Sequence, residues 1–180
     1  ALENGFIQKT FIDPIVKPCY LFALVAGDLE QVQSTFTTTS NRKVDIFLHT
    51  QKKNIDKTDF ALDALVKAMR WDEEVWGLEY DLDVYHIVAT DHFNMGAMEN
   101  KGLNVFNSQY VLGSKHSATD RDYKNIMAII AHEYFHNWTG NRVTLRDWFQ
   151  LSLKEGLTVF REQQFMEDLV GVAQSRIDDL

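Results

Sequence analysis

Two histidines and two carboxylates in the second half of the chain have the types and spacing of a hydrolytic metal centre. The run from His132 to His136 reads HEYFH. If it is helical, both imidazoles project from one face and can share one metal ion. Glu133 lies about 100° around the helix from His132, where it can reach a water molecule without itself binding the metal. Glu155 follows after 18 intervening residues, enough for a turn and a return helix. Two imidazoles and one carboxylate leave a fourth tetrahedral position open, which predicts a catalytic zinc site.

Both the histidine pair and Glu155 have competing structural explanations. Three fixed residues can match by chance, with the histidines as ordinary helix residues, although a second helix carrying a glutamate favours metal binding. Ser152 and Glu155 also form the S-x-x-E pattern of a capping box, in which the glutamate would bond to its own helix. Gly156 lacks a side chain and would let a ligand come close, which favours the metal-ligand interpretation.

The elements that position these residues should begin with strands. Threonine-rich composition or period-two alternation predicts extended structure at residues 34–39, 44–49, 81–88 and 103–112. One helix interrupts them, beginning at Thr58 or Asp59 and stopping at Gly77. The apolar segment Tyr20 to Ala26 predicts a buried strand, with a buried and inert thiol at Cys19. With little before it to pair with, this strand should belong to a sheet formed upstream.

The second half of the chain should be helical. The helix of the metal motif should begin after a cap at Thr119 or Asp120 and end at Gly140-Asn141. A final helix should run from about Ser152 towards Leu169, and another is expected at 173–180. The buried side of the final helix is expected to be Leu153, Leu157, Phe160 and Phe165. Strands with one helix, followed by helices alone, predict an α+β fold.

Composition narrows the class of protein. The chain has 180 residues, is 45% hydrophobic and carries a net charge of −8. The acidic balance disfavours nucleic-acid binding and suits a cationic ligand such as a peptide amino terminus. The single cysteine excludes an internal disulfide and fits a reducing compartment. No apolar run reaches the roughly 20 residues of a membrane span, and no signal-peptide pattern is present, so we expect a cytoplasmic protein without membrane contact. The missing initiating methionine indicates a processed or excised piece.

A second motif, which precedes the metal-binding pattern in the sequence, indicates the family to which that pattern belongs. The run GAMEN at Gly96, Ala97, Met98, Glu99 and Asn100 precedes the HExxH motif and the later glutamate. This combination, with the flanking segments 138–144 and 153–157, resembles the gluzincin zinc aminopeptidase family over nearly the whole chain. From chemistry alone, a solvated loop charge is the better interpretation of Glu99, and Met95 and Met98 could be part of the core.

The resemblance implies a thermolysin-like metalloprotease catalytic domain, α+β in class, preceded by a β-domain. Residues 1–28 would be the last strands of that β-domain, and residues 29–180 the amino-terminal part of the catalytic domain. In the family a tyrosine well beyond the zinc glutamate stabilises the transition state, whereas all six tyrosines here precede Glu155. The chain therefore resembles a fragment, and the missing remainder of the enzyme should pack on it.

The resemblance also implies roles for individual residues. His132, His136 and Glu155 would hold one Zn²⁺ per chain, and Glu133 would act as general base and then general acid. Glu99 would bind the free α-amino group of a peptide substrate. The segment from Gly96 to Asn100 would line the substrate, with the backbone of its first three residues pairing to the peptide as an added strand.

Met95 would form a flexible cushion under the first substrate side chain. The predicted activity is release of amino-terminal residues from peptides. Two alternatives remain: a thermolysin-like endopeptidase, and a catalytically incomplete fragment that folds and binds zinc without turnover.

Overall fold

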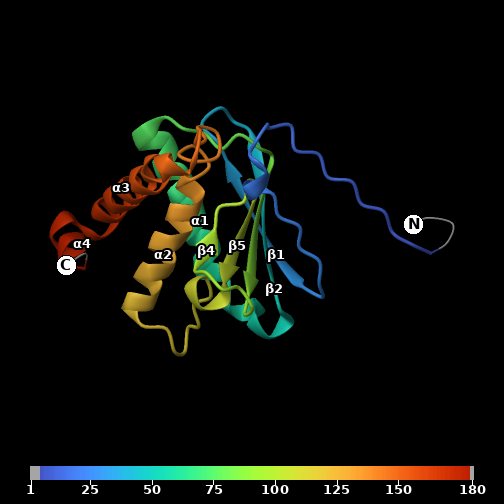
Figure 1. Cartoon of the computed structure of the whole chain (residues 1–180). Coiled ribbons are helices and arrows are strands. Elements are labelled where there is room, and N and C mark those ends of the chain that lie inside the picture. Colours follow the sequence, from blue (N-terminus) through green and yellow to red (C-terminus); the bar gives the residue numbers. More distant parts are fainter. Residues whose placement is uncertain (1–4, 179–180) are drawn as a thin grey trace.

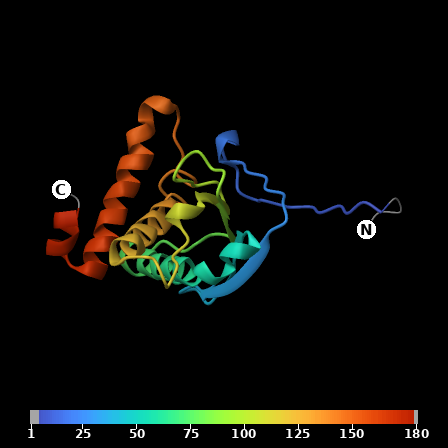
Figure 2. The same cartoon turned by 90° about the horizontal axis from the view of Figure 1, so that it is seen from below.

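The computed structural model describes residues 5–178, and its centre is a mixed five-stranded sheet with helices packed on one face (Figure 1, Figure 2). The strands are β1 (Glu30–Thr37), β2 (Lys43–Thr50), β3 (Val84–Thr90), β4 (Ala97–Met98) and β5 (Leu103–Asn107). The α-helices are α1 (Asp59–Trp71), α2 (Asp120–Phe135), α3 (Leu151–Val170) and α4 (Val172–Asp178). Short 3₁₀ turns lie at Cys19–Leu21, Lys52–Lys57, Ser108–Tyr110 and Trp148–Gln150. The predicted α+β class is confirmed.

The sheet places β4 at its edge. The strand order is β1-β2-β3-β5-β4, with β1 and β2 antiparallel, β2 to β3 and β3 to β5 parallel, and β4 antiparallel to β5. Helix α1 makes the crossover between the parallel strands β2 and β3. Because β4 has β5 on one side only within the described residues, its other edge is available for pairing.

The core lies between the sheet and helices α1 and α2. Along β2, Val44, Ile46 and Leu48 are fully buried, while the residues between them are partly exposed, as the predicted alternation requires. Leu65 of α1 and Ile130 of α2 pack into the same cluster. Each such side chain contributes roughly 1.5–3 kcal/mol on burial, so this cluster anchors α2 to the sheet.

Helix α2 begins as predicted but ends earlier. Thr119 and Asp122 form a complete capping box at its start. Its last helical residue is Phe135, and His136 is the C-cap, four residues before the predicted end at Gly140. The chain folds back there because the amide of Asn141 bonds to the carbonyl of His136 at 2.9 Å, which replaces a continued helical turn.

The amino-terminal segment departs from prediction. Tyr20 to Ala26 is not a strand: a 3₁₀ turn at Cys19–Leu21 is followed by irregular backbone, and Leu21 is the only fully buried residue among them. Cys19 is exposed rather than buried. An apolar run forms a strand only where an edge accepts its hydrogen bonds, and here Leu21 offers its carbonyl to the amide of Lys101 at 3.2 Å instead. Figure 1 shows the chain before this turn extending away from the body.

Helix α3 buries a different face from the one predicted. Leu153, Leu157 and Phe160 are 55%, 48% and 49% exposed, and of the predicted set only Phe165 is buried. The face turned towards α2 instead carries three buried polar side chains, Lys154, Thr158 and Arg161. Apolar spacing misidentified this face because α3 packs against polar groups, among them Asp72 and the carbonyl of Phe135, which bond to Arg161.

Smaller differences concern element ends. The strand predicted at 81–88 begins at Val84, and the one predicted at 103–112 ends at Asn107 before a 3₁₀ turn. Helix α1 continues as a π-helical turn, Asp72–Trp76, and Gly77 stops it with a positive φ of 67°, as predicted. The expected last helix appears as α4, while residues 179–180 lie outside the described residues. Of the helices within residues 5–178, none combines the length and apolar character needed to cross a membrane.

Candidate metal centre

Three predicted ligands converge where α2 ends and α3 begins. The Nε2 atoms of His132 and His136 are 3.0 Å apart. An oxygen of Glu155 lies 3.5 Å from the first of these nitrogens and 3.4 Å from the second. Ligand atoms of a tetrahedral zinc ion are about 3.3 Å apart, because zinc binds nitrogen and oxygen at roughly 2.0–2.2 Å. The three atoms therefore form a triangle of the size that one zinc ion requires.

Hydrogen bonds fix both imidazoles in the tautomer that a metal needs. His136 places Nδ1 2.9 Å from the carbonyl of Thr139, an acceptor, so this nitrogen carries the proton. His132 places Nδ1 2.9 Å from a carboxylate oxygen of Glu162, with the same consequence. Both Nε2 lone pairs then face each other and the Glu155 oxygen. Three electron-rich atoms at such distances repel one another unless a cation lies between them, so the donor set fits a divalent metal.

The carboxylates around His132 make this position favourable for positive charge, as a metal-binding position requires. Burial lowers the pKa of His132, but the carboxylates of Glu155 and Glu162 accept hydrogen bonds from its ring, outweigh the effect of burial and raise that pKa to about 10. The two imidazoles hold the pKa of Glu155 far below its usual value. The capping-box alternative is wrong: Gln150 precedes α3 and no side chain caps it, so Ser152 and Glu155 both lie inside the helix.

Glu133 lies beside the metal position, and one of its carboxylate oxygens is unpaired among the described residues. It is 7% exposed, and its Oε2 has no hydrogen-bond partner among the described residues. Burial, with help from the charges of Glu99 and Glu155, raises the pKa of Glu133 to about 8. A carboxylate with a raised pKa and a free oxygen next to a metal position can accept a proton from a nearby water.

Glu99 is buried, so its interpretation as a solvated loop charge is wrong. It is 4% exposed, and an oxygen contacts the ammonium of Lys154, which also bonds to Glu155 at 2.5 Å. Ligand atoms of Glu99, Glu133 and His136 lie within 4.8 Å of one another. The GAMEN carboxylate thus shares one cluster with the metal ligands and the candidate base.

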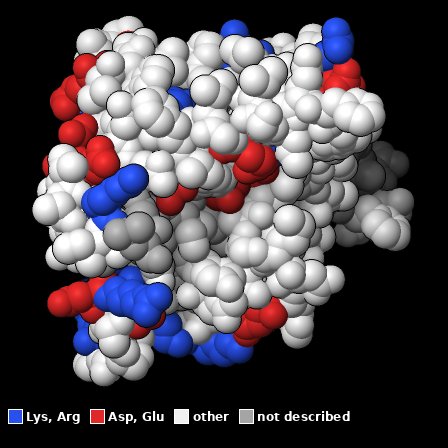
Figure 3. Space-filling model, turned by 60° about the vertical axis from the view of Figure 1, so that its left-hand side comes forward, with Lys and Arg blue, Asp and Glu red and all other residues white. Residues whose placement is uncertain are grey.

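The rest of the GAMEN run lies along the edge strand. Ala97 and Met98 form β4 and pair with β5, and the carbonyl of Gly96 accepts the amide of Asn107 at 2.9 Å. Asn100 is 6% exposed, whereas Met95 is 64% exposed. Figure 3, which turns the α2 and α3 side forward, shows one group of Asp and Glu near the middle of that face and another along its left-hand edge.

Sequence reasoning missed Glu162 and Lys154. Glu162 lies seven residues after Glu155, so about two helical turns place both on the side of α3 that faces α2. That spacing is a usable signal only once the packing of α2 against α3 is known. Lys154 directly precedes the candidate ligand Glu155, but nothing local indicates that its ammonium is buried between two carboxylates.

The sheet, the HExxH helix and the second helix with its glutamate together define the core of a metallopeptidase catalytic domain. Comparison with protein families specifies it further. The model described as "Peptidase family M1 domain" matches residues 60–179, and the chain belongs to this family.

Similar proteins agree with this assignment. The chain is 60% identical over 179 residues to aminopeptidase N of Escherichia coli (strain K12) and 58% identical over 179 residues to that of Haemophilus influenzae. Each alignment covers 99% of this chain and 21% of the relative, so the chain spans about a fifth of their length. A crystal structure of Legionella pneumophila aminopeptidase A in complex with aspartic acid superposes with a TM-score of 0.91 at 42% identity, over 93% of this chain and 20% of that one.

Proposed function

We propose that this chain is part of a zinc-dependent aminopeptidase that releases amino-terminal residues from peptides. The observation that carries the proposal is the convergence of a zinc-sized triangle of ligands with a buried carboxylate from the GAMEN run. One zinc ion per chain would be held by His132, His136 and Glu155. When bound, it would lower the pKa of a water molecule towards roughly 7 and polarise the scissile carbonyl.

Glu133 serves as the proton carrier. Its buried, partner-free oxygen takes a proton from the attacking water and later gives it to the departing amine. Burial raises the pKa of Glu133 above that of an ordinary carboxyl, which helps it to hold a proton between accepting and returning it.

Glu99 provides the selection for a free amino terminus. A substrate ammonium would bond to this buried carboxylate, and an internal peptide would leave it without that partner. Lys154 already contacts Glu99, so the substrate ammonium joins or displaces that contact.

The edge of β4 receives the peptide backbone. Gly96, Ala97 and Met98 lie at the edge of the sheet, where an extended peptide can add as a further strand. Met95 is exposed just before this edge and serves as the cushion for the first side chain. Asn100 is buried and bonds to the carbonyl of Phe22, which holds the end of the run in place.

The surroundings of the site remain part of the proposal. We propose that residues 1–28 belong to a preceding β-domain and residues 29–180 to the catalytic domain, with further parts of the enzyme packed on both. A cytoplasmic location is supported by the single cysteine, which lies exposed.

The proposal is tested by Glu133→Gln in the full-length enzyme. We expect zinc content by mass spectrometry to stay at one per chain, while hydrolysis of an alanine anilide falls by several orders of magnitude. Glu74→Gln, an exposed carboxylate on the turn after α1, is the matched control and should keep full activity. Near-wild-type hydrolysis by the Glu133 variant would refute the role of this residue.

A second variant separates the aminopeptidase from the two alternatives. Glu99→Gln should weaken cleavage of free-amine substrates selectively. A wild-type enzyme that cleaves internal peptide bonds equally well would support an endopeptidase. Zinc without any turnover would support a catalytically incomplete protein.

A further inference from the structure

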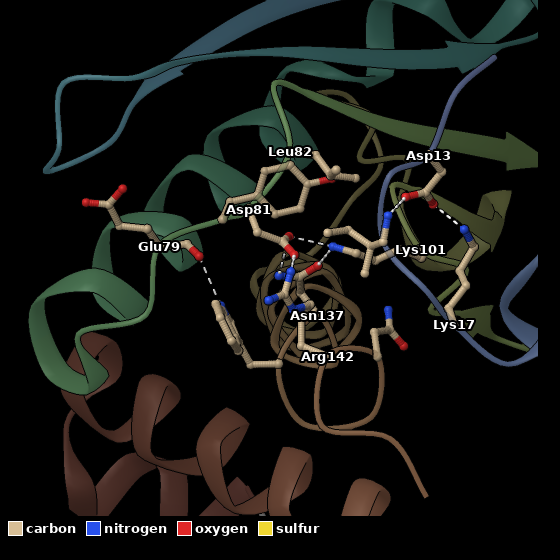
Figure 4. A network of polar contacts seen from close by, with 12 residues as sticks. Asp13, Lys17, Glu79, Asp81, Leu82, Lys101, Asn137 and Arg142 are labelled. Atoms are coloured by element: carbon tan, nitrogen blue, oxygen red, sulfur yellow. Dashed lines mark hydrogen bonds and ion pairs between the residues drawn. The ribbon is translucent and has the colours of Figure 1, made fainter. Parts of the chain in front are cut away.

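A polar network, buried at Lys101 and Asn137 and open to solvent at Arg142, adjoins the metal centre through Asn137, and none of its members belongs to the proposed catalytic set. Figure 4 shows Asp81, Lys101, Asn137 and Arg142 with their polar ends turned towards one another. The ammonium of Lys101 bonds to Oδ1 of Asp81 at 2.5 Å and to Oδ1 of Asn137 at 2.6 Å. The amide nitrogen of Asn137 is 3.2 Å from the same Asp81 oxygen, and Arg142 donates to the other one at 2.8 Å.

The network joins three segments that are far apart in the sequence. Lys101 lies two residues after Glu99, at the end of the GAMEN run. Asn137 directly follows the ligand His136, beyond the end of α2. Asp81 comes from the segment before β3 and bonds to both of the others. The carboxylate proposed to bind the substrate amine lies two residues from Lys101, and the proposed ligand His136 lies one residue from Asn137, so both adjoin the same network.

A second hydrogen bond strengthens this link. The side-chain amide of Asn141 donates to the backbone carbonyl of Glu99 at 2.9 Å, and the backbone N–H of Asn141 donates to the backbone carbonyl of His136. Gly102, which follows Lys101, has a φ of 74°, and a Cβ there would come within 3.1 Å of Leu82. The loop therefore turns sharply at a position that tolerates little change.

We propose that Lys101 and Asp81 are positioning residues that set the separation between Glu99 and the metal centre. This inference rests on the proposed function. In the amino-terminal residue of a peptide, the free amino group and the scissile carbonyl are held at a fixed spacing. The distance between Glu99 and the metal centre therefore decides whether both groups can be bound at the same time.

The burial of Lys101 explains why the pair can act as a spacer. Its side chain is 0% exposed and that of Asp81 is 12% exposed, so removal of the ammonium leaves a gap at a position shielded from solvent. The Asp81 carboxylate keeps Arg142 and Asn137 as partners in that case, which should preserve the fold while the GAMEN loop loses its tie.

The test compares two inhibitors of the full-length zinc enzyme. An α-amino hydroxamate can bind the metal and Glu99 together, whereas the matched hydroxamate without the amino group binds the metal alone. In the wild-type enzyme the amino group should increase affinity. In Lys101→Met we expect that ratio of affinities to fall at least tenfold, with zinc content and binding of the hydroxamate without the amino group unchanged. Asp81→Asn, which keeps the size of the side chain, should lower the ratio in the same direction.

The control and the contrary outcomes separate positioning from general stability. Asp83→Asn removes the exposed partner of Arg42 only two residues from Asp81 and should leave the ratio unchanged. An unchanged ratio in both test variants, or a parallel loss for both inhibitors, would overturn the inference. A wild-type ratio near one would instead count against the proposed role of Glu99, and so against the function on which the inference rests.

Discussion

Replacing Glu162 with alanine should weaken zinc binding even though this residue does not bind the metal. Its carboxylate lies 2.9 Å from Nδ1 of His132 and is 25% exposed. The bond orients the ring and makes its other nitrogen a better donor. Loss of such an outer partner typically costs 10- to 100-fold in metal affinity, or about 1.4–2.7 kcal/mol.

The partial exposure of Glu162 decides which end of that range applies. A water molecule can take over part of the hydrogen bond to Nδ1, so we expect roughly a tenfold loss for Glu162→Ala. Glu162→Gln should lose less, because its amide oxygen can still accept the ring N–H.

The assay is competition for zinc between the full-length protein and a chelator of known affinity at constant pH. Glu74→Ala removes an exposed carboxylate and serves as the control for the change in net charge. Wild-type affinity in Glu162→Ala would refute the reasoning, as would a larger loss in the glutamine variant than in the alanine variant.

Two further predictions concern stability. Arg161→Met leaves Asp72 buried without its cation and removes the donor to the carbonyl of Phe135 at the end of α2. The free energy of unfolding, measured in urea, should therefore fall by about 3–5 kcal/mol. A loss below about 1 kcal/mol would contradict this prediction. His49 and His86 bond to each other at 3.0 Å, and burial lowers both of their pKa values below 6.5. The unfolded chain therefore binds protons more readily than the folded one, so the stabilisation by the neutral pair is complete above pH 6.5 and is lost as the pH falls below it. His86→Gln should therefore flatten the dependence of the urea midpoint on pH. Equal slopes in the variant and the wild-type protein would show that the pair does not titrate in this way.

Local patterns predicted most of the elements and indicated candidate metal ligands whose atoms lie close together in the structure. The spacing of His132 and His136 fixes their geometry as soon as α2 forms, and the capping box at Thr119 marks where that helix starts. The alternation in β2 likewise predicts which side chains are buried. These features depend on hydrogen bonds and side-chain periodicity within one element, which the sequence states directly.

Features that depend on neighbours were predicted poorly. Apolar composition predicted a strand at Tyr20 to Ala26, but a strand needs an edge to pair with, and none of the described residues offers one there. The same criterion chose the wrong face of α3, where Lys154 and Arg161 are buried because their partners come from other segments of the chain. The sequence shows how apolar each residue is, but it does not show which residues of other segments it will contact.

The sequence by itself therefore indicated the candidate ligand set and, through the GAMEN run, the family. Only the tertiary structure decided that Glu99 is buried next to those candidate ligands, that Glu162 contacts His132, and that Lys101 bonds to Asn137 beside His136. The physical reason is that metal-ligand spacing within one helix is a short-range property, whereas burial and outer hydrogen bonds arise between segments dozens of residues apart.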